Sequence, residues 1–274
     1  MEERTKKSFD FIKTILMLDE VRDLEKYDDQ GVKVTDHTYD VLDIAIKIIK
    51  NKYNTLEEAK KYLDFFVINV SVIIHDISKG SIRKSSEELS HSQMMKKNPE
   101  YIVKEVFETL EKVESLTGYF LRDDIKNNIA HVVLTHHGKW GKYQPETDEA
   151  KIVHKADMES ATLHRINPIN ANDILELVHK GMTLDEVEVE LNCSSTVIKD
   201  RLKRSKRIVR VLTNKELYEI YKEKGEVPIG DEFFETRSKE TKELKEKMEE
   251  SGFLNLMLTN PLLEYIDDEK IFKN

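Results

Sequence analysis

The chain has 274 residues, of which 35% are charged, and its formal net charge is −9 at pH 7. This acidic balance argues against non-specific nucleic-acid binding by the whole surface, although a local basic patch is compatible with it. The single cysteine, Cys193, excludes an internal disulfide framework and suits a reducing compartment. No apolar run is long enough to span a bilayer, and the N-terminus lacks the apolar core of a signal peptide, so we expect a cytoplasmic protein without a membrane partner.

Helical periodicity dominates the N-terminal part of the chain. Residues 8–26 place apolar side chains at roughly helical spacing, which predicts an amphipathic leading helix. Residues 28–31, Asp-Asp-Gln-Gly, are typical of a turn. A second helix is then expected to begin near Asp36, with His37 in its first turn.

A third helix is predicted from Thr55, which forms a capping box with Glu58. We expect this helix to continue through the apolar run FFVINVSVIIHDISKG. The pair His75-Asp76 would then lie at the C-terminal end of the helix.

The following segments are also mostly helical in pattern. Residues 80–98 are polar and are interpreted as a loop followed by a short helix from about His91. Further helices are predicted at 99–116, 122–136 and 147–166. The expected fold class is therefore all-α, a helical bundle with a smaller helical appendage and a C-terminal helical tail.

Residue types that bind metals follow these elements in a fixed order. Imidazole nitrogens and carboxylate oxygens suit zinc, iron, manganese, nickel or magnesium, and the set is large enough for one or two divalent ions. The pattern does not decide which metal binds. The set comprises His37, His75, Asp76, His91, His136, His137 and Asp157.

Two metals sharing Asp76 would account for this set. Adjacent helical residues point about 100° apart, so a His-Asp pair converges on one cluster most easily at a helix end. One ion would take His37, His75, Asp76 and Asp157, and the other would take Asp76, His91 and His136. Two such ions can activate a water and hold phosphate oxygens. Lys79, one turn after Asp76, would bring positive charge to that phosphate, and His137 would serve in proton transfer.

The segment HDISKG resembles the signature of the HD-domain metal-dependent phosphohydrolases, and the order H…HD…H…HH…D resembles their two-metal branch. The stretch THHGKWGKYQPETDEAKIVHKADMESA is similar to the HD domain of the 3′-5′ exoribonucleases of Gram-positive bacteria. The resemblance covers roughly residues 30–168 and implies a helical HD fold. It also implies the same metal ligands, with Lys79 and His137 on the phosphate side.

The sequence departs from these relatives in three places. Ser78 stands where glycine is usual, and too few residues precede His37 for the OB-fold barrel that the exoribonucleases carry. The Gly-Tyr-Pro signature of cyclic-dinucleotide phosphodiesterases is absent. A phosphohydrolase is therefore expected, with 3′-5′ exonuclease activity on RNA or single-stranded DNA as the specific prediction. The alternative is hydrolysis of free (deoxy)nucleotides or cyclic nucleotides.

Two aromatic residues, Trp140 and Tyr143, follow the His136-His137-Gly138 segment. They could stack on a base of the substrate. Alternatively, they anchor the loop to the core, and the sequence favours neither interpretation.

Residues 181–207 resemble a helix-turn-helix, with Thr183 as the first cap and 194–202 as the recognition helix. Glu188 stands where a small residue is usual, so a solvated hairpin or a dimer contact is the alternative. The DNA-contact hypothesis implies a function of another class, a ligand-sensing DNA-binding regulator. Its candidate nucleic-acid contacts are Lys199, Arg201, Arg204 and Arg207.

The C-terminal part combines a charged helix, 232–250, with the apolar segment FLNLMLTNPLLEYI. This segment should dock either on the body of the protein or on a partner subunit in a homo-oligomer. The chain is thus divided into an HD domain (1–170), a basic helical region (171–222) and a C-terminal helix with its tail (223–274).

Overall fold

The computed structural model describes residues 6–29, 31–80, 91–164, 171–191, 193–205, 212–227 and 231–273. Within these ranges the regular structure is helical, apart from a short antiparallel pair, β1 (Asp28–Asp29) with β2 (Val32–Lys33), and one isolated bridge. The all-α prediction is confirmed. Contacts divide the chain into two compact units, residues 1–165 with 241–274 and residues 166–240. The three-part division with boundaries at 170 and 222 stays a prediction.

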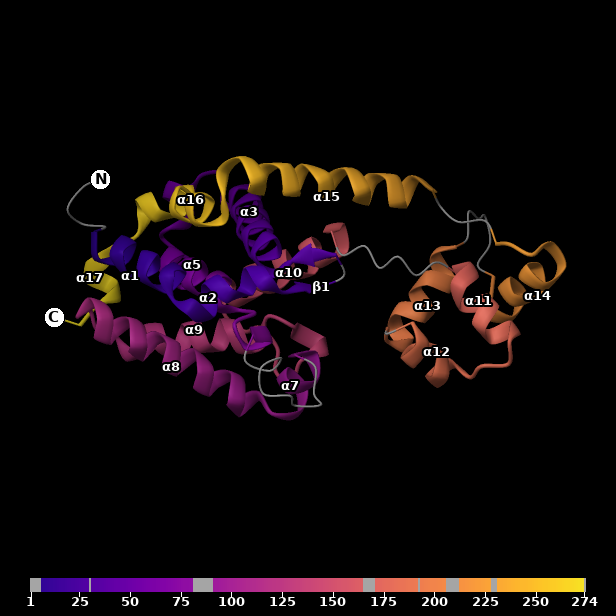
Figure 1. Ribbon diagram of the computed structural model, residues 1–274. Helices are drawn as coiled ribbons and strands as arrows, with labels where there is room; N and C mark the ends of the chain where they lie inside the picture. Colours follow the sequence, from indigo (N-terminus) through magenta and orange to yellow (C-terminus); the bar gives the residue numbers. More distant parts are fainter. Residues whose placement is uncertain are drawn as a thin grey trace. The chain divides into compact units, whose positions relative to one another are not determined.

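Helix α5 (Phe65–Ile74) is the central element of the first unit (Figure 1). All of its residues are buried, as expected for a helix that is apolar on every face. It packs against α1 (Lys6–Met17), α3 (Val34–Tyr53), α9 (Asp123–Thr135) and α10 (Asp148–His164). Because α5 ends at Ile74, its burial carries the following residues, His75 and Asp76, into the interior.

The other elements of this unit connect or cover that core. Helices α3 and α10 pack along each other, and α8 (Pro99–Thr117) packs on α1 and α9. The shorter elements are α2 (Asp19–Arg22), η2 (Asp23–Lys26), α4 (Leu56–Ala59), α7 (His91–Lys97) and η3 (Gly138–Trp140).

Two predicted helices are each interrupted. The leading helix ends at Met17, because Leu18 adopts an extended conformation (φ −61°, ψ 139°) before α2 begins. The helix predicted from Thr55 is wrong in its extent: the Thr55 hydroxyl caps only the four-residue α4. A second cap then starts α5, where the Asp64 carboxylate accepts hydrogen bonds from the N–H groups of Phe66 (2.9 Å) and Val67 (3.2 Å).

The Asp64 carboxyl makes the free energy of unfolding depend on pH. Burial raises the pKa of its carboxyl to about 6, although the two N–H groups lower it. Since this pKa lies above the unfolded value, Asp64 favours the folded state below about pH 4, and this contribution is lost as the pH rises through 6. Asp64→Asn keeps a capping oxygen without the charge. We expect this variant to gain about 1–3 kcal/mol over the wild type at pH 8 and little at about pH 3.5, below the unfolded pKa. Urea unfolding of both proteins at the two pH values measures this, and an equal difference at both would contradict it.

The C-terminal tail docks on the body of the same chain. The buried side chains of Met257 and Leu262 join the main core, and Asn260 Nδ2 donates to Asn69 Oδ1 of α5 at 2.9 Å. The Asp268 carboxylate accepts hydrogen bonds from the N–H groups of Lys7 and Ser8 at the start of α1. The elements of this part are α15 (Asp231–Ser251), α16 (Phe253–Leu258), η4 (Pro261–Tyr265) and α17 (Asp268–Ile271).

The second unit has its own small core of aliphatic side chains, among them Ile174, Val187, Ile198 and Leu217. Its second helix begins at a capping box of Thr183 and Glu186, at the predicted cap position. Its helices are α11 (Ala171–His179), α12 (Leu184–Glu190), α13 (Ser195–Arg204) and α14 (Asn214–Lys224). Among the helices described in either unit, none combines the length and the apolar character needed to cross a membrane.

Candidate metal centre

Five segments of the first unit bring the predicted ligands together. His37 lies in the first turn of α3, and His91 is the first residue of α7. The pair His75-Asp76 follows the last turn of α5, and His136-His137 follows the last turn of α9. Asp157 comes from α10. Helix ends thus supply most of these side chains, because an end lets adjacent residues turn toward one point.

Hydrogen bonds to main-chain oxygens orient two of the histidines. His75 Nδ1 donates to the carbonyl of Val72 at 2.7 Å, and His136 Nδ1 donates to the carbonyl of Val133 at 2.6 Å. A donating Nδ1 fixes the tautomer in which Nε2 carries the free lone pair. Both rings are therefore prepared to bind a metal through Nε2.

Asp76 lies between two groups of ligand atoms. Its Oδ2 is 3.4 Å from His75 Nε2 and 3.9 Å from His37 Nε2, while its Oδ1 is 3.3 Å from His91 Nε2 and 4.0 Å from His136 Nε2. One group that could hold an ion is His37, His75 and Asp76, and the other is His91, His136 and His137; within each group the ligand atoms lie within 4.8 Å of one another. Asp76 could therefore supply one oxygen to an ion in each group.

Asp157 and Ser160, both on α10, hold the His37 ring. His37 Nε2 lies 3.0 Å from Asp157 Oδ1, and its Nδ1 lies 2.9 Å from Ser160 Oγ. Asp157 therefore adjoins the first group, as the sequence predicts, whereas the contact with Ser160 was not anticipated.

Electrostatics keep Asp76 ionised in spite of its burial. Burial raises the pKa of its carboxyl, but the Lys79 ammonium, 2.6 Å from Oδ2, and the neighbouring His75 hold that pKa well below the usual value. An ionised carboxylate is the form that binds a cation. Lys79 thus lies against the bridging residue, where the sequence places it.

The second group of histidines is neutral. Burial lowers the pKa of both His91 and His137 to about 3, with neighbouring imidazoles and Lys79 contributing, and lowers that of His136 well below the ordinary value. Neutral imidazole is the form that ligates metals. The sequence interpretation gave His137 a role in proton transfer; the structure places it with His91 and His136, its ring centre 5.0 Å and 4.4 Å from theirs.

The donor set fits divalent ions. The Nε2 atoms of His75, His91 and His136 are fully buried, and none of them has a hydrogen-bond partner among the described residues. Such atoms are costly unless they bind something. Three converging lone pairs beside an ionised carboxylate are best explained by ligation of metal ions.

The match to known families agrees with this geometry. Residues 34–162 match the family model described as the HD domain. Over these residues the chain is similar to HD domains. HD domains form a superfamily of metal-dependent phosphohydrolases, so the reaction class is metal-dependent hydrolysis of a phosphate compound. No curated protein and no solved structure matches the chain significantly. The finer resemblance to exoribonucleases stays a prediction.

One further residue of the HD domain organises the His136-His137-Gly138 turn. His154 of α10 donates from Nδ1 to the carbonyl of His136 at 2.5 Å. Its ring also lies against Gly138, where an added Cβ would be 2.4 Å from His154 Cε1. Sequence reasoning did not single out His154. Its position three residues before Asp157, on the same helix, was the available signal.

Trp140 and Tyr143 lie at the surface of the HD domain, 47% and 43% exposed. A lysine ammonium lies over each ring, Lys139 at 4.8 Å from the Trp140 centre and Lys142 at 5.4 Å from that of Tyr143. Both side chains are exposed rather than packed in the core, and their role in stacking stays a prediction.

The predicted nucleic-acid contacts in the second unit are only partly at the surface. Lys199 is exposed on α13, but Arg201 is 8% exposed and turns toward the unit's interior, so its assignment as a surface contact is wrong. It follows Ile198 by three residues and precedes Leu202, and both of these belong to the core. The side chain of Arg204 and the whole of Arg207 lie outside the described residues. DNA binding by this unit stays a prediction.

Proposed function

We propose that this HD-domain phosphohydrolase is a phosphodiesterase that cleaves single-stranded nucleic acid from the 3′ end. The observation that carries the proposal is the loop after the metal centre, which presents two exposed aromatic rings, each with a lysine above it. Aromatic faces stack on bases of any sequence, and adjacent cations attract the phosphates. A substrate with several bases and phosphates can contact more of these rings and lysines than a single nucleotide can.

Divalent ions held by the two ligand groups would polarise the scissile phosphate and activate the attacking water. The protein's own residues have separate tasks in this scheme. Lys79 balances the charge of Asp76 and lies close enough to the bridging position to attract a phosphate oxygen. Asp157 and Ser160 fix the orientation of the His37 ring. Because the pKa of His137 is about 3, this residue is unprotonated at neutral pH, the form that ligates a metal ion, and is too weak a base to accept a proton there.

The experiment is a substrate panel with metal analysis of the purified protein. A 5′-labelled single-stranded RNA or DNA incubated with manganese should give a ladder that shortens from the 3′ end, and chelator should stop the reaction. Mononucleotides and cyclic nucleotides should remain intact. Hydrolysis of free nucleotides without any ladder would overturn the assignment to polymers, while leaving the metal-dependent reaction class in place.

Trp140 and Tyr143 allow a sharper test of the same proposal. Trp140→Ala with Tyr143→Ala should raise KM for the oligonucleotide about tenfold or more, since stacking contributes about 1–3 kcal/mol per base. Hydrolysis of a small activated phosphodiester should not change, because that substrate has no base to stack. The exposed Phe120, which lies outside this loop, provides the control substitution Phe120→Ala. Equal losses on both substrates would contradict a role in base stacking.

A further inference from the structure

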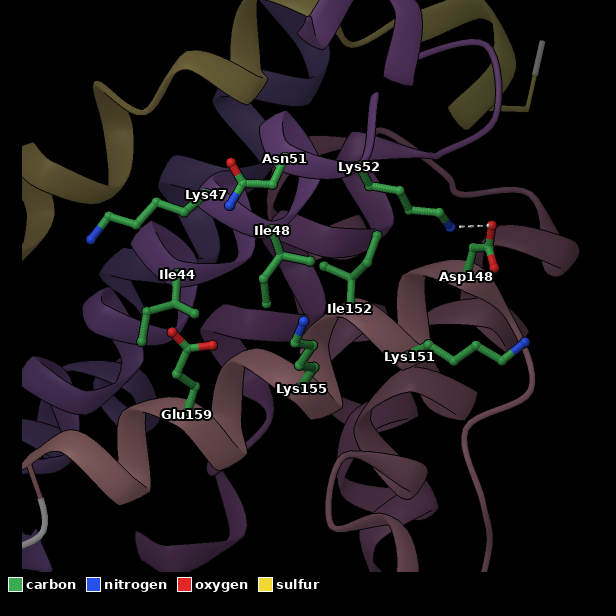
Figure 2. A pocket seen from close by; sticks show the side chains of 10 residues that line it. All are labelled: Ile44, Lys47, Ile48, Asn51, Lys52, Asp148, Lys151, Ile152, Lys155 and Glu159. Atoms are coloured by element: carbon green, nitrogen blue, oxygen red, sulfur yellow. Dashed lines mark hydrogen bonds and ion pairs between the residues drawn. The ribbon is translucent and has the colours of Figure 1, made fainter. Parts of the chain in front are cut away.

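A second surface of the first unit lies apart from the metal ligands, in the groove between α3 and α10. The groove has a volume of about 480 Å³. Its floor is formed by Ile44, Ile48 and Ile152, and its sides carry four lysines against two carboxylates, although the chain as a whole is acidic. Figure 2 shows all of these side chains. The lysines are Lys47, Lys52, Lys151 and Lys155, and the carboxylates are those of Asp148 and Glu159.

The cations are spread along the groove rather than gathered at one point. In Figure 2 the Lys155 ammonium reaches toward Ile48 in the middle, Lys47 lies at one end, and Lys52 and Lys151 lie at the other. Lys52 is paired with Asp148 at 3.0 Å, and Lys47 with Asp43 at 2.9 Å. Lys151 and Lys155 are both exposed. A row of separated cations matches a linear polyanion better than a single phosphate group.

An aromatic platform adjoins the end of the groove where Lys52 and Asp148 lie. The Lys52 ammonium is 4.9 Å from the centre of the Tyr53 ring, and the Tyr53 hydroxyl donates to Asp148 at 3.3 Å. Tyr62 stacks on Tyr53 with ring centres 5.7 Å apart and planes 14° apart, yet remains 64% exposed. An exposed tyrosine held flat by a second ring is prepared to stack on a base.

We propose that the α3–α10 groove binds a single-stranded segment of nucleic acid, with its phosphates on the lysines and one base on Tyr62. The same two helices carry His37 and Asp157, and the groove begins about 10 Å along α3 from His37, seven residues at the helical rise. In its choice of ligand this inference rests on the proposed function. The groove then takes the place of a separate nucleic-acid-binding domain, by holding the part of the polymer that is not being cleaved.

Fluorescence anisotropy in chelator, with a labelled single-stranded RNA and its DNA counterpart, measures this binding without cleavage. Lys151→Ala with Lys155→Ala should weaken binding about tenfold at low salt and reduce the log–log salt slope by about 1.4, the value for two lost phosphate contacts on a single strand. Tyr62→Ala should weaken it about 5- to 100-fold, while Tyr62→Phe should bind as the wild type does.

A matched double variant controls for the loss of positive charge. Lys50→Ala with Lys104→Ala removes two exposed lysines of the same unit that do not line the groove, and should leave binding unchanged. Equal weakening by both double variants, or none by either, would overturn the proposal. Equal affinity of the wild type for duplex and single strand would also overturn it, since paired bases cannot reach Tyr62.

The outcomes separate this inference from the proposed function. If the wild type binds single strands through the groove but produces no ladder, the groove proposal stands and the exonuclease assignment fails. If the double variant Lys151→Ala with Lys155→Ala produces a ladder as well as the wild type does, the exonuclease assignment stands and the groove proposal fails. If both hold, the double variant should impair cleavage of long substrates and leave cleavage of a dinucleotide unchanged.

Discussion

Asp76→Ala should remove both bound metal and phosphohydrolase activity. Asp76 lies within 4.0 Å of the Nε2 atoms of four histidines, so its loss removes the carboxylate of one ligand group and the one that adjoins the other. Metal ions contribute several kcal/mol to stabilising the charge of such a transition state, which corresponds to a loss of activity of about a thousandfold or more. Metal content per chain and kcat/KM on any substrate cleaved by the wild type are the two measurements.

Substitution of a buried carboxylate can also unfold a protein, so a matched control is needed. Glu114 is a buried carboxylate paired with a lysine, Lys126, at 2.7 Å, just as Asp76 is paired with Lys79. Glu114→Gln should lower stability while keeping metal and activity per folded molecule. Asp76→Asn, which preserves the shape of the side chain, should fold and still lack metal. Full metal content in Asp76→Asn would contradict the bridging role.

The order of the candidate ligands along the chain was sufficient to predict that their side chains come together. Apart from His91, which lies in the polar segment 80–98, these residues lie in or beside apolar helical segments, and the apolar run before His75 indicates that this residue is carried into the interior. The fold class followed from the same signal. Helix boundaries were less predictable where two caps compete, since the capping box at Thr55 gave no indication that Asp64 starts a second helix.

Other features depend on which helices meet, and no local pattern shows this. The α3–α10 groove combines side chains about a hundred positions apart in the sequence, and the contact of His154 with Gly138 joins two separate segments. Arg201 is different, because its burial could have been predicted. Ile198 and Leu202 define the core face of this helix, and Arg201 lies three residues after the first and one before the second. The periodicity that located the helix therefore also places Arg201 on its inward side.

Gly138→Ala is expected to damage the metal centre without touching a ligand. Gly138 has φ +51°, a conformation that is unfavourable for alanine by about 1 kcal/mol. The added Cβ would also lie 2.4 Å from Cε1 and 2.6 Å from Nε2 of the His154 ring. That ring cannot move away and still donate to the His136 carbonyl, so the turn carrying His136 and His137 must shift. We expect a loss of about 1–3 kcal/mol in stability and at least a tenfold loss in metal affinity.

A double-mutant cycle with His154→Ala separates the two causes. His154→Ala removes the hydrogen bond to His136 but opens the space that the new Cβ needs, so the double variant should lose much less than the sum of the single variants. What remains should be the backbone strain at residue 138 together with the missing hydrogen bond. Manganese affinity, measured alongside the free energy of unfolding, distinguishes a disturbed ligand position from general destabilisation. Strict additivity in both measurements would show that His154 does not restrain the turn, and its place beside Asp157 on α10 would then have no bearing on the ligands.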